Sequence, residues 1–330
     1  MASAVVCSSD SLGGGVPSFC TPKRNILITQ QSLALMELWL IFALLSPLGY
    51  ALVNVIEKFL LEKKIKNFYS YAVFTGFLYV VPISIIWYFV GFPDIDQKIA
   101  SIALFVGLCC GMLHFLYYYA LTKYEVSRIM GLFYIYPVFV ALFSFLFIGE
   151  RLSLVHYTAI AIAVFSTVFL GIEKHKEKWR ISHLFWIMML ASILPAVIDV
   201  SDKYLLGSYT YWEVYLLVMI PTSIVNILPI LSRTVRRDLY QPVHFIFPML
   251  VIEITAFGAG YSFLRAASIA PISLVSTYGT LQPVFVFVLI LMLSLFIPSI
   301  LKEPMTRHAI FHKAIGIAAI VAAAVILSLV

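Results

Sequence analysis

Two short segments place charged side chains inside long apolar runs at the same spacing. Residues 54–61 read NVIEKFLL and residues 199–206 read DVSDKYLL, 145 positions apart. In a helix each segment presents one polar face. The first face consists of Asn54, Glu57 and Lys58, with Tyr50 one turn before the segment. The second consists of Asp199, Asp202 and Lys203, with Pro195 one turn before it.

Carboxylates and lysines at such depth in hydrocarbon are costly and are typical of ion, proton or solute pathways. At about 1.5 Å per residue, each acid-lysine pair lies within one or two turns of a membrane surface. We therefore interpret the two clusters as a pair of gates, one for each face of the membrane. In the alternative interpretation, the lysines only reach the headgroups and the acids accompany them.

Two further residues could bind protons. Glu253, in VIEITAFGAGYSF, lies about 11 Å into its apolar run at about 1.5 Å per residue. Burial there disfavours the charged form of a carboxyl group, so Glu253 could bind and release a proton. The alternative is a structural pairing with a tyrosine or with Arg265. His114, in GMLHFLYYYAL, could titrate near neutral pH or be a hydrogen-bonded core residue.

Tyrosines are dense in the same runs, and a phenol combines an apolar face with one hydrogen bond, which suits a cavity for an amphipathic solute. Tyr136 in YPVFV corresponds to Gln282 in QPVFV, and each precedes a proline that frees a backbone carbonyl. Substrate contact is one interpretation, and core packing or helix flexing is the other. The candidate cavity residues of this kind are Tyr118, Tyr136, Tyr278 and Gln282.

The elements that position these residues are membrane-spanning helices. The 330 residues are 62% hydrophobic and 12% charged, far from the roughly 25% charged of soluble domains. Continuous apolar runs approach the roughly 20 residues that a spanning helix needs, whereas a β-barrel needs alternating segments. The sequence predicts an all-α polytopic membrane protein with ten helices, at 37–61, 69–91, 99–121, 129–148, 155–172, 184–206, 213–231, 246–267, 272–297 and 312–330.

Basic residues indicate the topology. The loops opposite the N-terminus carry 16 of the 22 Lys and Arg residues, so the positive-inside rule puts these loops in the cytoplasm and both termini outside. We expect a multi-pass protein of the plasma or inner membrane. The net charge of +6 requires no nucleic acid as a partner.

The two halves of the chain resemble each other. At an offset of 146, YPVFV at 136–140 lies over QPVFV at 282–286. An odd number of helices in each half turns the second half upside down, as in many secondary transporters. The sequence therefore predicts two inverted five-helix repeats, 37–172 and 184–330, joined by a basic loop at 173–183, after a disordered tail at 1–36. A transit peptide or a misassigned start codon are alternatives for this tail.

The stretch YPVFVALFSFLFIGERLS at 136–153, followed by HYTAIAIAVFSTVFLGI, resembles the EamA domain of the drug/metabolite transporter superfamily. The Asn54 to Lys58 segment resembles the start of that domain, and the second half resembles it more loosely, with Glu303 displaced by an insertion. The resemblance implies ten helices and alternating-access transport of small metabolites. It also implies a cavity lined mainly by helices 1 to 4 and 6 to 9.

Other features indicate what else to expect. The sequence lacks the Walker A, HExxH, GxSxG and CxxC patterns, so we expect neither an enzyme nor a cofactor or metal. Cys109 and Cys110 are interpreted as packing residues.

Small residues at four-residue spacing in helix 5 (Ala159, Ala163) and helix 10 (Ala318, Ala322) predict close helix packing, within the bundle or in a homodimer.

The leading hypothesis is a secondary transporter of a small organic metabolite, amino acid-like or otherwise amphipathic, in the lipid bilayer. Efflux is the expected direction, coupled to protons through Glu253 or Asp199. One alternative is a facilitative exchanger in which Lys58 and Lys203 alternately hold an anionic solute. The other is a non-transporting lipid-handling scaffold or membrane enzyme.

Overall fold

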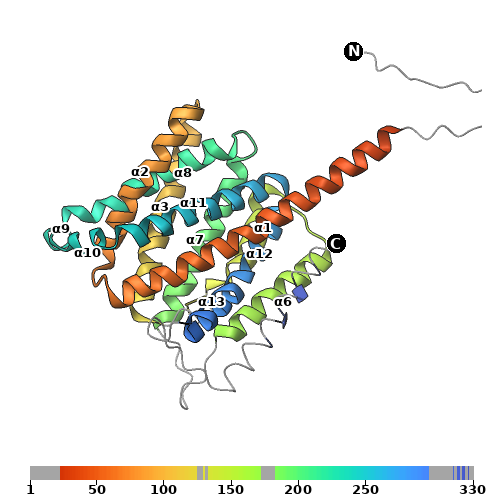
Figure 1. Ribbon diagram of the computed structural model, residues 1–330. Coiled ribbons are helices and arrows are strands. Elements are labelled where there is room, and N and C mark those ends of the chain that lie inside the picture. The colour runs from red at the N-terminus through yellow and green to blue at the C-terminus, as the bar shows by residue number, and fades with distance from the viewer. Residues whose placement is uncertain are drawn as a thin grey trace, which may run out of the picture. The chain divides into compact units, whose positions relative to one another are not determined.

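The computed structural model describes residues 23–124, 129–130, 133–171 and 183–296 and a few residues between 315 and 326. Every regular element in these ranges is a helix (Figure 1). The chain divides into two units, residues 1–37 and 38–330. In the first unit, residues 23–37 are helical, although we expected residues 1–36 to be a disordered tail. The helical residues 23–37 contain no Gly or Pro that would end a helix.

The elements follow one another with short connections. In chain order they are α1 (Lys23–Lys63), α2 (Phe68–Val90), α3 (Gln97–Lys123), α5 (Tyr136–Phe143), the π-helix η1 (Ser144–Ile148), α6 (Leu154–Gly171), α7 (His183–Leu205), α8 (Tyr211–Ile227), η2 (Leu228–Leu231), α9 (Arg233–Asp238), α10 (Tyr240–Val243), α11 (Ile246–Ile269), α12 (Ile272–Tyr278), η3 (Gly279–Leu281) and α13 (Gln282–Phe296).

Six segments among the described residues are long and apolar enough to cross a membrane. They are Leu38–Lys63, Phe68–Val90, Gln97–Lys123, Tyr211–Leu231, Ile246–Ile269 and Ile272–Leu293. Two shorter apolar helices cover Tyr136–Ile148 and Leu154–Ser166. The number of ten spanning helices therefore stays a prediction, and the expected helix at 312–330, the loop at 173–182 and Glu303 lie wholly or mainly outside the described residues.

The two helices expected at 129–148 and 272–297 are each interrupted, at corresponding places. A turn at 134–135 precedes α5, and the 3-10 turn η3 precedes α13. Pro137 is the second residue of α5 and Pro283 the second residue of α13. A proline removes a helical hydrogen bond and clashes with the carbonyl four residues before it. The interruptions leave Tyr136 and Gln282 as the first residues of the helices that follow.

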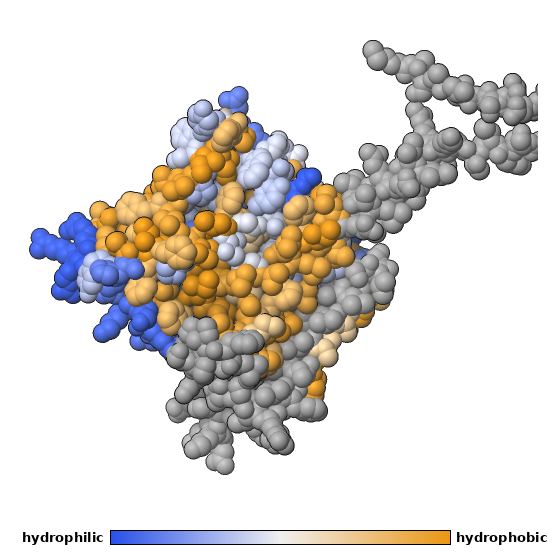
Figure 2. Space-filling view, viewed as in Figure 1, coloured by the Kyte–Doolittle hydropathy of each residue, from blue (hydrophilic) through white to orange (hydrophobic). Residues whose placement is uncertain are grey.

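The outer surface is apolar over the length of the helices. Exposed Leu, Val, Ile, Phe and Trp side chains lie on α1, α2, α3 and α11. Figure 2 shows them as an orange band, with hydrophilic side chains gathered around α9 and α10 at one end. This distribution is that of a protein whose helices lie in hydrocarbon and whose loops lie in water.

α2 and α8 run in opposite directions. At one end of the bundle, the amide of Asn67 donates to Asp238 (3.0 Å), so the start of α2 lies beside α9, which follows α8. At the other end, the Tyr209 hydroxyl donates to the carbonyl of Asp94 (3.0 Å), so the end of α2 lies beside the start of α8. The second and seventh predicted spans therefore enter the bundle from opposite ends.

Close packing of α3 against α8 depends on two glycines. A Cβ atom on Gly107 would lie 2.4 Å from Cγ of Pro221 and 2.9 Å from the backbone N of Thr222, and one on Gly111 would lie 2.2 Å from a methyl of Val225. Small residues four positions apart let helices approach closely in lipid. The sequence GLCCG therefore sets the distance between these two helices.

We expect Gly107→Val to destabilise the protein by about 1–3 kcal/mol, because neither the Pro221 ring nor the backbone at Thr222 can move aside cheaply. The matched control is Gly258→Val in α11, where nothing lies within 4 Å of the added Cβ. Thermal unfolding in detergent measures both. Equal melting temperatures for the two variants would contradict the packing role of Gly107.

Candidate functional site

A cavity of about 320 Å³ lies in the middle of the helices. Residues of α1, α2, α3, α5, α7, α8, α11, α12 and α13 line it, so both halves of the chain contribute. Nine of the twelve site residues predicted from the sequence line this cavity: Asn54, Glu57, His114, Tyr118, Tyr136, Asp199, Asp202, Glu253 and Gln282.

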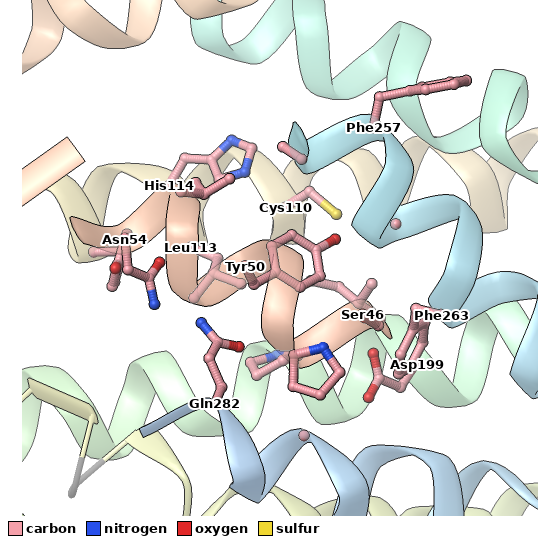
Figure 3. A pocket seen from close by; sticks show the side chains of 18 of the residues that line it. Ser46, Tyr50, Asn54, Cys110, Leu113, His114, Asp199, Phe257, Phe263 and Gln282 are labelled. Carbon is pink, nitrogen blue, oxygen red and sulfur yellow. The ribbon is translucent and has the colours of Figure 1, made fainter. Parts of the chain in front are cut away.

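The polar faces of α1 and α7 meet at the cavity. Ser46, Tyr50, Asn54 and Glu57 extend along α1, each turn adding one residue to the same face. In Figure 3, Asn54 and Asp199 lie on opposite sides of Tyr50. Position 54 of the first segment and position 199 of the second therefore both border this cavity rather than lipid.

The carboxylates differ in their partners. Glu57 accepts a hydrogen bond from the Tyr71 hydroxyl (3.2 Å). Asp199 and Asp202 are both 8% exposed, and within the described part of the chain Oδ2 of Asp199 and Oδ1 of Asp202 have no hydrogen-bond partner. A buried carboxylate without a partner is costly, so these oxygens require a proton or a positively charged group.

Three predicted site residues do not line the cavity. Tyr278 is 2% exposed and packs edge-on against Trp39, with ring centroids 5.6 Å apart. The other two are Lys58 and Lys203. Their ammonium groups turn away from the carboxylates beside them in sequence and bind the ends of neighbouring helices.

The two lysines make the same contact in the two halves. Nζ of Lys58 donates to the carbonyls of Leu121 (2.9 Å) and Tyr124 (2.7 Å), at the end of α3, and also pairs with Glu62 (3.1 Å). Nζ of Lys203 donates to the carbonyls of Ala267 (2.5 Å) and Ala270 (2.9 Å), at the end of α11. The last carbonyls of a helix lack helical partners and attract cations, so each lysine caps a helix C-terminus.

Aromatic rings form much of the wall. His114 stacks on Tyr118, with centroids 5.6 Å apart and an angle of 17° between the rings. Nδ1 of His114 lies 3.0 Å from the amide nitrogen of Asn226. His114 is therefore a hydrogen-bonded residue of the cavity wall, and its titration near neutral pH stays a prediction.

The interrupted helices of the two halves contact each other beside the cavity. The Tyr134 hydroxyl hydrogen-bonds the Gln282 side chain, and the Tyr136 hydroxyl donates to the carbonyl of Ser276 (3.0 Å). Nearby, the hydroxyl oxygens of Ser144 and Ser273 are 2.7 Å apart. These bonds join α5 and η1 of the first half to α12 and α13 of the second.

Glu150, in the GERLS segment, holds the start of α12. Its carboxylate accepts hydrogen bonds from the backbone N–H of Ile272 (2.9 Å) and Ser273 (3.2 Å), and from the Ser273 hydroxyl. The first N–H groups of a helix have no helical partners and favour a negative charge. Glu150 therefore ties the loop after η1 to the other half of the chain.

Several cavity residues were not predicted as site residues. They include Ser46, Tyr50, Tyr79, Cys110 and Tyr215. For Ser46 and Tyr50 the signal was present, because they continue the spacing of Asn54 and Glu57 toward the start of the helix. Cys109 and Cys110 are both buried, as expected of packing residues, but Cys110 also borders the cavity. No group of three or more potential metal ligands occurs within the ranges described above.

Comparison with known proteins identifies a domain in the first half of the chain. A model described as "EamA-like transporter family" matches residues 37–172. These residues are an EamA domain. EamA domains belong to transporters of the drug/metabolite transporter superfamily, which are integral multi-pass membrane proteins and not enzymes.

A likeness of fold to a solved structure extends over both halves of the chain. A protein of known crystal structure is similar over 86% of this chain and 96% of its own, with 17% sequence identity and a TM-score of 0.59. At this identity the likeness establishes a shared fold. No curated protein matches the chain by sequence.

Proposed function

We propose that this EamA protein is a secondary transporter that moves a small organic metabolite by exposing one central cavity alternately to the two sides of the membrane. The observation that carries this proposal is the cavity itself. Its polar residues come from corresponding positions of two helices, Asn54 and Glu57 on α1 and Asp199 and Asp202 on α7. A transporter built from inverted repeats places its site between them in this way.

We propose that ten spanning helices form two inverted five-helix repeats. Three observations support this arrangement. α2 and α8 run in opposite directions. Lys58 and Lys203 cap the helices that correspond to each other, α3 and α11. The interruptions before Pro137 and Pro283 fall at corresponding positions.

Rocking of the repeats requires contacts that can break. The bonds of Glu150 to the start of α12, of Ser144 to Ser273 and of Tyr136 to Ser276 link the two repeats, one near the end of the bundle and the others toward the cavity. Polar contacts of this kind can be exchanged for contacts with water at low net cost. We propose that they break when the transporter opens at this end.

We propose proton-coupled efflux across the plasma membrane. Four carboxyl groups border the cavity, those of the buried residues Glu57, Asp199 and Asp202 and of the half-buried Glu253, and each can carry a proton in a site of low polarity. Facilitative exchange of an anion held by Lys58 and Lys203 gains no support, because both ammonium groups bind backbone carbonyls away from the cavity.

A homodimer would use the row of small residues in the helix predicted at 312–330. Ala159 and Ala163 of α6 are 0% and 1% exposed, so other parts of the same chain cover them. Ala318 and Ala322 are exposed. We propose the latter pair as the dimer contact, since small residues let two helices approach closely in lipid.

Transport is tested by counterflow in proteoliposomes. Vesicles containing purified protein are loaded with single metabolites, and uptake of the same labelled metabolite is measured against protein-free vesicles. We expect at least one water-soluble solute to exchange. A protein that binds only lipids in a parallel thermal-shift screen, and exchanges no solute, would instead be a lipid-handling scaffold.

A further inference from the structure

The cavity lining has an unbalanced charge. It contains the four carboxyl groups named above, and no Lys or Arg among the residues that the structure describes. Lys58 and Lys203 are next in sequence to the lining residues Glu57 and Asp202. Each of these lysines donates two hydrogen bonds to backbone carbonyls at a helix C-terminus. The negative charges of the lining therefore receive no positive side chain from within the cavity.

The acidic groups on α7 are positioned to receive a positive group. Asp199 and Asp202 are three residues apart, on one face of the helix, and both line the cavity. Each has one buried carboxylate oxygen with no hydrogen-bond partner in the described structure. A buried ionised carboxylate costs several kcal/mol unless a counter-charge or hydrogen bonds satisfy it. A bound anion would raise this cost further, and a bound cation would remove it.

The aromatic part of the lining has the same preference. Tyr50 lies between Asn54 and Asp199 in Figure 3, and Phe257 and Phe263 border the same space. The faces of such rings carry negative charge density and attract ammonium groups, by about 2 kcal/mol or more where water is excluded. Rings also bury the apolar part of a solute.

The cavity size limits the solute. A volume of about 320 Å³ lies at the lower end of the roughly 300–1,000 Å³ of ligand pockets. It suits a molecule with one ring or a short apolar chain and one charged head.

We infer that the transported solute is a small organic cation, an amine or quaternary ammonium with an apolar or aromatic body, whose positive head binds between Asp199 and Asp202. This inference rests on the proposed function, because it assigns a substrate class to the same cavity. Protons occupy the carboxylates when the cation leaves, so that cation and proton exchange without net accumulation of charge in the site. Zwitterionic amino acids and organic anions are disfavoured, since their carboxylates would face the four acidic groups.

Calorimetric titration of the purified full chain tests this inference with three probes that share a phenyl ring. Benzyltrimethylammonium is a cation, phenylalanine a zwitterion and phenylacetate an anion. We expect benzyltrimethylammonium to bind at least about tenfold more tightly than the other two, a difference of about 1.4 kcal/mol. The variants Asp199→Asn, Asp202→Asn and the double variant should each weaken cation binding, and the double variant should abolish the preference.

The matched control is Asp94→Asn, because Asp94 is exposed in the loop between α2 and α3, outside the cavity. It should bind benzyltrimethylammonium like the unaltered chain. Asparagine has nearly the shape of aspartate, and thermal unfolding verifies that each variant is folded. If one asparagine variant fails to fold, the other single variant and the three-probe comparison on the unaltered chain still decide the result.

The outcomes separate the inference from the proposed function. Equal or tighter binding of phenylacetate or phenylalanine overturns the cation assignment, as does a double variant that keeps its preference for the cation. If calorimetry contradicts the cation assignment but vesicles still exchange other metabolites in the counterflow assay, the protein is a transporter of another substrate class. If they exchange no solute at all, the proposed function falls as well.

Discussion

We expect Glu253→Gln to abolish uptake driven by a pH gradient in proteoliposomes while leaving solute counterflow in place. Glutamine keeps the size and hydrogen-bonding capacity of the side chain but cannot carry a proton. Counterflow requires only that the loaded carrier moves in both directions, whereas gradient-driven uptake requires a proton to move in exchange. The two assays therefore separate coupling from binding.

The surroundings of Glu253 favour this role. Glu253 lines the cavity from α11, together with Glu57, Tyr79, Tyr118 and Tyr215 of the neighbouring helices. None of these groups is a cation, and Arg265 lies 5.5 Å from the ring of Tyr211 instead. A carboxyl group placed near a second carboxyl group, without a cationic partner, can alternate between a protonated form and a form neutralised by solute.

A matched control for this variant is Glu62→Gln at the end of α1. The Glu62 side chain is 44% exposed and does not line the cavity, and its partner Lys58 (3.1 Å) also donates two hydrogen bonds to backbone carbonyls. Glu62→Gln should keep both activities. Undiminished pH-driven uptake by Glu253→Gln would remove Glu253 from the coupling mechanism, and loss of counterflow as well would indicate a role in solute binding.

Helical periodicity was enough to predict the polar faces of the site. Asn54 and Glu57, like Asp199 and Asp202, lie on one face because their spacing repeats with the helical turn, and a polar face in an apolar helix turns toward other polar groups. Glu253, singled out by its depth in an apolar run, and His114, singled out as a residue that could bind a proton, also line the cavity. These features depend only on residues close to one another in the chain, so a single sequence is enough to reveal them.

The lysines show where such reasoning ends. Lys58 and Lys203 share the faces of the cavity residues, but their long side chains reach the carbonyls at the ends of α3 and α11. Which helix ends lie within reach depends on the packing of helices about 65 positions apart in sequence, and spacing within one helix carries no information about it. The same holds for Glu150, whose partners Ile272 and Ser273 are more than 120 positions away.

A disulfide between the repeats should stop transport almost completely. The hydroxyl oxygens of Ser144 in η1 and Ser273 in α12 are 2.7 Å apart, and both side chains are buried, at 0% and 1% exposure. Cysteines at the two positions would face each other at a separation that a disulfide can close with small adjustment. The covalent bond would hold the two halves of the chain together at a contact that the proposed rocking has to break.

The double variant Ser144→Cys/Ser273→Cys would be oxidised in proteoliposomes, with cross-linking followed by mass spectrometry of the joined peptides. We expect counterflow to fall to the level of protein-free vesicles on oxidation and to return on addition of a thiol reductant. Each single variant and the unaltered chain, which retains its own Cys7, Cys20, Cys109 and Cys110, should show no such response. Because counterflow needs both orientations of the carrier, full cross-linking with unchanged exchange would mean that the repeats do not separate at this contact. In that case the movement that admits the solute would have to occur within one repeat.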